Sequence, residues 1–429
     1  MSLTGRLFMV LMLASVAAGF LALVWSWPRW AGRGARSILT RAFLLAAVNA
    51  LVLLTTAVAV NDQFVFFADW TDLSGVVGMA GTTATTDAHA GGDPHAALSR
   101  PADGSSATPG LPPALPAQIA RGDRLVRFTV DGPASGIRAQ VEVYLPAGYT
   151  DPAERLRRYP VLEAFPGYPG GPFVPADAVA AVVDTHRMAD PIIVSPVVEI
   201  PAGRDSECVD GTPRDPKVET WLTRDVPDWA QRTLRVRPDR TSWATIGWSA
   251  GGWCAAMAAM LHPDRYAAAI VLGGYFRPDF GALYTPFLPD SPQGRRYDLI
   301  ALAGHHPPAV ALWIQTSQAD LLSYPTSAQL LVKARPPLSV QSLVMSHAGH
   351  RTQVWIPLLP QALTWLAATA PGFTPAPPAR TGPPLPSPTA HPASRNPATP
   401  APAAPASTGP GPGPGKPHLT TVKRSTQPR

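Results

Sequence analysis

The chain has 429 residues, of which only 15% are charged and 52 are proline, and its formal net charge is +6. This length allows two or three domains, while the composition excludes a coiled coil and a disulfide-dense mini-protein. The charge does not indicate a nucleic-acid partner, because residues 1–41 and 371–429 carry basic side chains and no acidic ones, which leaves the middle of the chain mildly acidic.

Two uncharged apolar runs near the N-terminus, Leu7–Trp27 and Ala42–Val60, predict a pair of membrane-spanning helices. The loop between them, Pro28–Arg41, carries four arginines. The positive-inside rule therefore places this loop in the cytoplasm and everything after residue 61 outside it. The alternative is that the first run is a cleavable signal peptide. We expect residues 1–61 to anchor the protein in the cell membrane, with an extracytoplasmic catalytic domain.

Two further segments lack the pattern of a folded core. Residues 62–121 are predicted to form a flexible linker, because from residue 71 they are rich in Gly, Ala, Thr, Pro and Asp without a hydrophobic period. Residues 371–429 contain 18 prolines and a single aromatic residue, Phe373, so we expect a disordered tail. Residues 122–370 have the size of one globular domain.

The domain of residues 122–370 is predicted to have an α/β fold. Arg124–Val130 and Gln140–Leu145 alternate apolar and polar residues, which indicates an antiparallel hairpin. Helical patterns such as Gly252–Leu261 and Leu359–Ala368 alternate with buried-strand runs, which favours a mostly parallel, doubly wound sheet. The predicted buried strands are Pro160–Phe165, Pro191–Val198, Trp243–Trp248, Ala268–Leu272, Val310–Gln315 and Ser339–Met345.

A G-x-S-x-G motif lies between a predicted strand and a predicted helix of small residues; it reads Gly247-Trp248-Ser249-Ala250-Gly251. This strand–turn–helix context is the one that a nucleophile elbow requires. The flanking glycines permit a tight turn that lifts the serine hydroxyl above the sheet. We therefore expect Ser249 to be a nucleophile and the Ala250 amide to stabilise a developing oxyanion.

A serine nucleophile needs a general base and an acid that orients the base, and in this fold class the chain order is Ser, Asp or Glu, then His. Asp320 and His350 follow predicted strands, and ligand sites of open α/β sheets collect at such strand ends. They are the expected acid and base. Other residues are alternatives. Asp298 or Asp279 could be the acid, His347 could be the base, and His305 and His306 lie in a loop that could cover the site.

The second oxyanion donor should lie in the loop Phe165–Gly171, which follows an early strand. Pro166 and Pro169 have no N–H group to donate. Gly167 and Tyr168 remain, and we expect the Tyr168 amide to donate. The alternative interpretation of this segment is a plain Gly/Pro turn.

The two cysteines of the chain, Cys208 and Cys254, both fall in the region expected to lie outside the cytoplasm. An even pair in an oxidising compartment favours a disulfide, which would tie the loop of residues 205–220 to the helix after the nucleophile. A pair of free thiols is the alternative. We expect no metal, because no Cys/His cluster has ligand spacing, and no cofactor.

Three separated segments of the domain read RYPVLEAFPGYPG, GWSAGGWCAAMAAMLHPDRYAAAIVLGG and SHAGHRTQVWIPLLPQALTWL. Together they resemble the esterase D family and, within it, the mycolyltransferase-like branch of the α/β-hydrolases. The resemblance implies an α/β-hydrolase fold, a triad of Ser249, Asp320 and His350, and oxyanion amides near Tyr168 and Ala250. The chain departs from many members by having Pro-Gly where they have His-Gly or Asp-Gly.

The expected function is therefore a membrane-anchored, extracytoplasmic serine hydrolase that cleaves a carboxylic ester through an acyl-enzyme. An ester from a lipid or from the cell envelope is the expected substrate class, and residues Phe276–Pro308 could form a lid. The main alternative is transfer of the acyl group to a sugar or another alcohol, as in the mycolyltransferases. A non-catalytic envelope-binding protein on the same fold is a further alternative, because fold alone does not establish activity.

Overall fold

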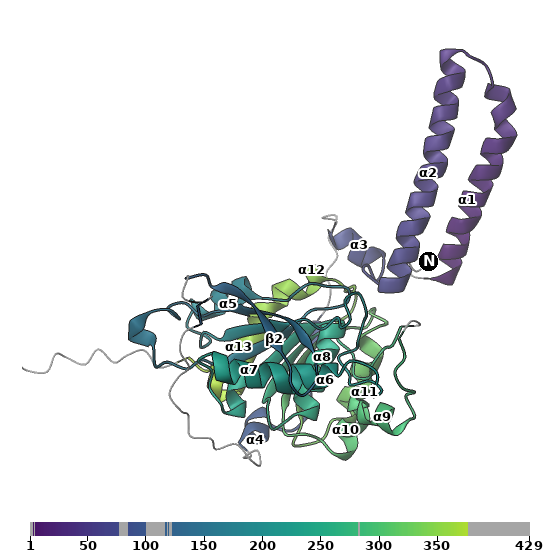
Figure 1. The fold of residues 1–429 in the computed structure, drawn as a ribbon. Coiled ribbons are helices and arrows are strands. Elements are labelled where there is room, and N and C mark those ends of the chain that lie inside the picture. Colours follow the sequence, from purple (N-terminus) through teal and green to yellow (C-terminus); the bar gives the residue numbers. More distant parts are fainter. Residues whose placement is uncertain are drawn as a thin grey trace, which may run out of the picture. The chain divides into compact units, whose positions relative to one another are not determined.

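The computed structural model describes residues 3, 5–76, 85–99, 116–117, 119, 122–281 and 284–375. Within this part of the chain, two long N-terminal helices precede a domain built on a nine-stranded sheet (Figure 1). The strands are β1 (Thr85–Gly91), β2 (Leu125–Asp131), β3 (Arg138–Tyr144), β4 (Val161–Phe165), β5 (Ile192–Pro196), β6 (Trp243–Trp248), β7 (Ala268–Leu272), β8 (Ala311–Ser317) and β9 (Ser339–Met345).

Helices join most of these strands. The α-helices are α1 (Arg6–Ser26), α2 (Ala35–Phe64), α3 (Trp70–Val76), α4 (Pro94–Leu98), α5 (Ala176–Val183), α6 (Val218–Thr220), α7 (Val226–Thr233), α8 (Ala250–Leu261), α9 (Pro292–Arg296), α10 (Leu299–His305), α11 (Tyr324–Lys333), α12 (Thr352–Trp355) and α13 (Leu359–Thr369). Shorter turns are η1 (Trp27–Trp30), η3 (Pro152–Glu154), η5 (Arg240–Ser242), η6 (Ile356–Leu358) and η7 (Pro371–Phe373), and η4 (Trp221–Asp225) is a π-helical turn.

The two N-terminal helices are each long and apolar enough to cross a membrane, with mean hydropathies of 2.6 and 2.4. They occupy the two predicted apolar runs, and α2 extends beyond its run at both ends. The helices pack on one another, and a side chain at Gly19 of α1 would approach Leu51 of α2 to 3.3 Å. Most of their apolar side chains are exposed in the described structure.

The sheet has the order β1-β9-β8-β7-β6-β4-β5-β3-β2. The six strands from β9 to β5 in this order run parallel to one another, whereas β2, β3 and β1 pair antiparallel with their neighbours. The predicted entry hairpin is confirmed in β2 and β3. The predicted mostly parallel, doubly wound sheet is confirmed in the six strands from β9 to β5. The fold is that of an α/β-hydrolase.

Both faces of the sheet are covered, as a parallel sheet requires. One face packs against α7 and α8, and the other packs against α5 and α13. Helix α8 is buried over nearly its whole length because its residues are mostly Ala and Gly, which let it approach the strands closely. This close packing fixes the helix that begins directly after Ser249.

The interpretation of residues 62–121 as a flexible linker is wrong for part of that segment. Residues Thr85–Gly91 form β1, which pairs with β9 along its whole length, and α3 and α4 also fall in the predicted linker. The sequence of β1 has no apolar alternation because this strand lies at the edge of the sheet, mostly exposed, and is held through its backbone. Residues 77–84 and most of 100–121 lie outside the described residues.

The domain also continues beyond its predicted end at residue 370. Phe373, which was assigned to the tail, is fully buried, and its carbonyl oxygen accepts a hydrogen bond of 2.8 Å from the Ala189 N–H. A side chain at Gly372 would collide with Ser242, so the chain is packed tightly here. The predicted disordered tail from residue 376 onward lies outside the described residues.

A buried carboxylate, Glu219, joins three elements on one side of the domain. It accepts hydrogen bonds from the His262 ring (2.7 Å), the Tyr297 hydroxyl and the Arg296 guanidinium. Burial by itself raises the pKa of Glu219, but these donors outweigh burial and bring the pKa down to about 2, from an ordinary value of 4.5.

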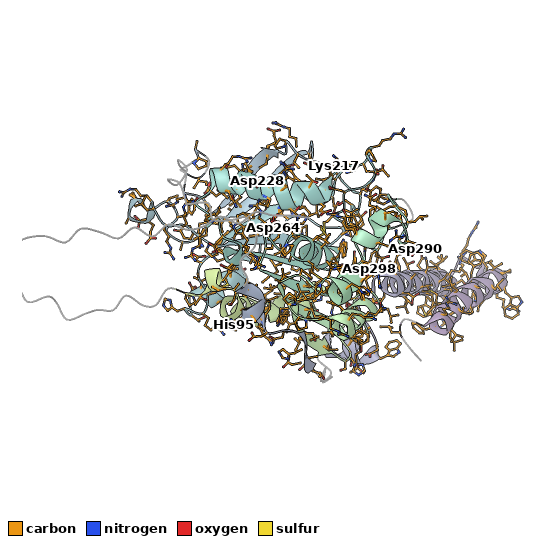
Figure 2. The ribbon with its side chains drawn as sticks, turned by 90° about the horizontal axis from the view of Figure 1, so that it is seen from below. His95, Lys217, Asp228, Asp264, Asp290 and Asp298 are labelled. Atoms are coloured by element: carbon orange, nitrogen blue, oxygen red, sulfur yellow. A yellow bond between two sulfur atoms is a disulfide. The ribbon has the colours of Figure 1, made fainter. Side chains whose placement is uncertain are left out.

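We expect Glu219→Gln to lower the free energy of unfolding by about 3 kcal/mol at pH 7, because a depressed carboxylate pKa stabilises the folded state by that order. The stabilisation is complete above pH 4.5 and declines as the pH falls toward about 2. Urea unfolding at pH 7 and pH 3 should therefore show a smaller difference between variant and wild type at pH 3. Asp228→Asn is the control (Figure 2 labels this residue), because its ion pair with Arg265 is partly exposed. An equal Glu219→Gln effect at both pH values would contradict this account.

Candidate active site

The structure places Ser249 in a sharp turn between β6 and α8. Its backbone has φ 54° and ψ −127°, a left-handed conformation that is strained for a residue with a side chain. Two hydrogen bonds hold this turn: the Ser249 N–H donates to the Leu272 carbonyl (2.9 Å), and the Trp253 N–H donates to the Ser249 carbonyl (3.1 Å). The strand–turn–helix expected from the motif is present.

The two glycines of the motif are required by close backbone contacts. A Cβ atom at Gly247 would lie 2.1 Å from the Gly251 carbonyl oxygen. A Cβ atom at Gly251 would lie 2.2 Å and 2.3 Å from the carbonyl oxygens of Phe165 and Pro166. Because only glycine fits here, the helix start can approach the loop that follows β4, on which the second predicted oxyanion donor lies.

The three residues expected to form a triad are in hydrogen-bond contact. His350 Nε2 lies 2.8 Å from Ser249 Oγ, and His350 Nδ1 lies 2.8 Å from Asp320 Oδ2. The side chains of His350 and Asp320 are only 8% and 3% exposed. An ionised carboxylate can only accept a hydrogen bond, so the proton is assigned to Nδ1, which leaves the Nε2 lone pair directed at the serine hydroxyl.

Asp320 is held in place from a second side. Its carboxylate accepts hydrogen bonds from the Ser323 hydroxyl (2.7 Å) and from the N–H groups of Leu322 and Ser323. Burial alone raises the pKa of Asp320, but the hydrogen bond and electrostatic interaction with His350, together with hydrogen bonds from Ser323, hold the pKa below its ordinary value. The carboxylate is therefore ionised at neutral pH and can stabilise a protonated imidazole.

The other candidate acids and bases lie in different surroundings. Asp298 (labelled in Figure 2) caps α10 and forms an ion pair with Arg277. Asp279 donates its backbone N–H to Glu207, and His347 forms an ion pair with Asp69. The remaining two, His305 and His306, are exposed at the end of α10.

The loop after β4 lies against Ser249. A Cβ atom at Gly167 would lie 3.2 Å from the Ser249 Cβ, so the loop backbone passes directly beside the serine. The Tyr168 hydroxyl donates to the Gly203 carbonyl and the Gly170 N–H donates to Glu199, which fixes the loop on its outer side. Neither the Tyr168 amide nor the Ala250 amide donates to another residue in the part of the chain described.

An aromatic stack lines one side of the site. The Trp248 ring lies 3.8 Å from Phe173 and 6.1 Å from Trp355, measured between ring centroids. Trp355 also presents its ring to His350 edge to face, at 4.8 Å. Sequence reasoning did not find Ser323, although the Asp-x-x-Ser spacing suits a local hydrogen bond to the carboxylate.

The predicted disulfide between Cys208 and Cys254 is confirmed, with a Cα–Cα distance of 5.6 Å. It joins the loop after β5 to the second turn of α8, and the Trp253 indole N–H reinforces the junction by donating to the Glu207 carbonyl (2.7 Å). The loop after β5 is therefore covalently attached to α8, the helix that begins directly after Ser249.

Removing this crosslink by a Cys208→Ser/Cys254→Ser double substitution should destabilise the domain by about 4 kcal/mol, because the bridge closes a loop of 46 residues. Thermal unfolding of the oxidised wild type, the reduced wild type and the double variant measures the effect. The last two should unfold at similar, lower temperatures. Unfolding of all three at the same temperature would mean that the bridge does not stabilise the fold.

The predicted lid segment, residues 276–308, contains α9 and α10, and residues 282–283 lie outside the described part. Tyr297 and Phe276 from this segment are fully buried, so the segment is anchored in the core at both points. Among the described residues, no group of three or more His, Cys, Asp or Glu side chains could hold a metal ion.

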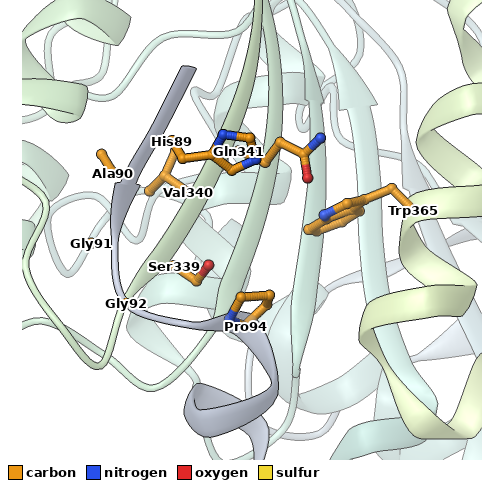
Figure 3. A pocket seen from close by; sticks show the side chains of 9 residues that line it. All are labelled: His89, Ala90, Gly91, Gly92, Pro94, Ser339, Val340, Gln341 and Trp365. Atoms are coloured by element: carbon orange, nitrogen blue, oxygen red, sulfur yellow. The ribbon is translucent and has the colours of Figure 1, made fainter. Parts of the chain in front are cut away.

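Two hollows lie outside the triad. One, of about 250 Å³, is lined by β1, the start of β9 and Trp365 of α13 (Figure 3). Since His350 follows the carboxyl end of β9, this hollow lies toward the opposite end of that strand. The second, of about 610 Å³, is lined by the β2–β3 turn, the start of β3, Val197, residues 199–202 and residues 214–216. It includes Glu199, which also holds the loop beside Ser249.

The Esterase family model, described as "Putative esterase", matches residues 133–366, which is more than half of the chain. An uncharacterised protein of Corynebacterium glutamicum is 32% identical over 161 residues, covering 36% of this chain and 37% of that protein. The match thus spans little more than a third of that relative's length.

Solved structures with related architecture include an S-formylglutathione hydrolase from Agrobacterium tumefaciens, with 16% identity and a TM-score of 0.48 over 57% of this chain and 95% of that one. MPT51 (FbpC1) of Mycobacterium tuberculosis has 17% identity and a TM-score of 0.40, with coverages of 58% and 100%. A ferulic acid esterase has 19% identity and a TM-score of 0.47, with coverages of 57% and 97%.

Proposed function

The chain belongs to the Esterase family, and from this premise we propose that it is a serine esterase or acyltransferase that cleaves a carboxylic ester through an acyl-enzyme formed on Ser249. The observation that carries the proposal is the continuous hydrogen-bonded chain from Ser249 through His350 to Asp320. Such a chain joins a nucleophile, a general base and an orienting acid in the geometry that acyl transfer requires.

The proposed reaction begins with proton transfer from the Ser249 hydroxyl to His350 Nε2 as the serine oxygen attacks the ester carbonyl. We expect the amides of Ala250 and Tyr168 to donate to the resulting oxyanion, and the N-terminus of α8 adds a favourable dipole. His350 then returns the proton to the leaving alcohol. A water molecule, activated by the same histidine, attacks the acyl-enzyme and regenerates the free serine.

We further propose that α1 and α2 anchor the enzyme in the cell membrane and that the catalytic domain lies on the extracytoplasmic side. Both helices expose apolar side chains around most of their circumference, which a bilayer would cover. The arginine-rich connection between them supports a cytoplasmic turn under the positive-inside rule. The disulfide supports the same side for the domain, since such bonds persist in oxidising compartments.

The proposal is tested by incubating the full chain in detergent with a fluorophosphonate probe and mapping the modified peptide by mass spectrometry. We expect modification of Ser249 and concurrent loss of hydrolysis of short-chain p-nitrophenyl esters. A folded chain that neither hydrolyses such esters nor reacts with the probe would refute the proposal. Repeating the assay with a sugar acceptor distinguishes hydrolysis from transfer, because transfer yields an acylated sugar in place of free acid.

A further inference from the structure

The polypeptide that leaves the second N-terminal helix contacts the loop that carries His350. We call residues Val65–Asp72 the exit segment and residues Ser346–Arg351 the histidine loop. The exit segment is tied to the end of α2 because the Asn61 side chain forms two hydrogen bonds with the backbone of Phe67, at 2.7 and 3.0 Å. The Ala68 N–H donates to the Asp72 carboxylate (3.0 Å), which braces the other end of the segment.

The first contact is with the backbone of the histidine itself. The His350 N–H donates a hydrogen bond of 2.8 Å to the Val65 carbonyl oxygen. The residue before it, Gly349, has no room for a side chain, since a Cβ atom would lie 2.1 Å from the Phe66 carbonyl oxygen. The backbone of the histidine loop is therefore seated directly on the backbone of the exit segment.

The second contact is a buried, two-pronged ion pair. Both terminal nitrogens of Arg351 lie 2.6 Å from the Asp72 carboxylate oxygens, and one of them also donates to the Phe66 carbonyl. The two side chains are only 10% and 5% exposed. A bidentate pair of this kind fixes geometry strongly, and removing one partner leaves a buried charge without compensation.

A third, more exposed contact lies at the start of the loop. His347 Nδ1 is 2.6 Å from Asp69 Oδ2, and these side chains are 49% and 28% exposed. Partial burial tends to raise the pKa of Asp69, but hydrogen bonds from the Asp72 and Thr71 N–H groups and the His347 ring bring the pKa below its ordinary value. The histidine loop is thus held on the exit segment before, at and after His350.

We propose that the exit segment positions His350 for catalysis, with Asp72 and Arg351 as positioning residues, so that the membrane-proximal region is part of the active-site structure. The inference rests on the proposed function, because it assigns a role to contacts made by the proposed general base. Loss of these contacts lets the loop shift, and a displacement of about 1 Å at a reacting group costs about 100-fold in rate. Substrate binding makes no use of these contacts, so KM should change little.

The test uses the full chain in detergent and compares wild type with Asp72→Ala, Arg351→Ala and the double variant. We expect kcat and the rate of fluorophosphonate labelling to fall about 10- to 100-fold in each, with KM nearly unchanged. The double variant should be about as slow as the single variants, because it lacks the same contacts. It buries no unpaired charge, so a slow rate in it cannot result from such a charge. Asp72→Glu should recover part of the labelling rate. Asp62→Ala is the matched control, since Asp62 is exposed on α2 and makes no ion pair among the described residues.

Wild-type labelling rates in folded Asp72→Ala and in the double variant would overturn the inference. Should the buried-pair variants fail to fold, Asp69→Ala decides the question, because its pair with His347 is more exposed than the Asp72–Arg351 pair and such pairs contribute little to stability. An unchanged labelling rate in that variant would also overturn the inference. A wild-type chain that does not react with the probe would instead refute the proposed function, so the two failures are distinguishable.

Discussion

Substituting Ser249 with Ala should lower kcat for ester hydrolysis by about 10⁴- to 10⁶-fold, the range for loss of a serine nucleophile. The hydroxyl is the group that would become acylated, and no other hydroxyl is hydrogen-bonded to His350 Nε2 in the described structure. The variant should still fold, because removing this one oxygen leaves the turn's backbone hydrogen bonds in place. Steady-state hydrolysis of a p-nitrophenyl ester measures the loss, and circular dichroism reports the fold.

The same assay on His350→Ala and on the Ser249→Ala/His350→Ala double variant tests whether the residues act as one unit. We expect the double variant to be no slower than Ser249→Ala, since nucleophile and base contribute to a single step. Retention of more than about one hundredth of the wild-type rate by Ser249→Ala would show that another group is the nucleophile.

Asp320→Asn should lower kcat by about 10³- to 10⁴-fold at neutral pH, with KM nearly unchanged. The amide has the size of the carboxylate and should keep the packing. However, its NH₂ group can donate to His350 Nδ1, which moves the ring proton to Nε2 and leaves no lone pair for the serine. The loss of the negative charge also removes the stabilisation of a protonated imidazole.

Asp298→Asn is the matched control, because Asp298 was a candidate acid in the sequence and serves in the structure as the cap of α10. Because Asn caps a helix about as well as Asp, the substitution should cost less than about 1 kcal/mol, from the partly exposed ion pair with Arg277, and should leave kcat within a factor of about two. Kinetics and thermal unfolding of both variants distinguish the two roles. If Asp298→Asn lost activity and Asp320→Asn retained it, the assignment of the acid would be wrong.

Much of the site was predictable because its parts obey local rules. The turn at Ser249 has its own sequence pattern, and Asp320 and His350 follow strands whose ends meet at one edge of a parallel sheet. A mostly parallel sheet was predictable from apolar runs alternating with helical patterns. The disulfide followed from an even cysteine count and the expected compartment.

The parts that could not be predicted depend on long-range contacts between segments of unremarkable composition. Strand β1 reads TTDAHAG, which has no apolar period, and only its pairing with β9 makes it a strand. The ion pair between Asp72 and Arg351 joins residues far apart in the chain, and nothing in either local sequence specifies the partner. Phe373 is buried in the core, but it directly precedes a proline-rich segment whose composition predicts disorder, so composition alone places it in the tail.

Strand β1 has a practical consequence for any shortened form of this protein. It covers β9 along seven residue pairs, so a chain beginning at residue 122, where composition places the start of the domain, would expose that strand's free N–H and C=O groups. An uncovered edge of this length is a template for pairing with another molecule. Such a fragment should therefore aggregate through its sheets, and a soluble version would have to begin upstream of Thr85.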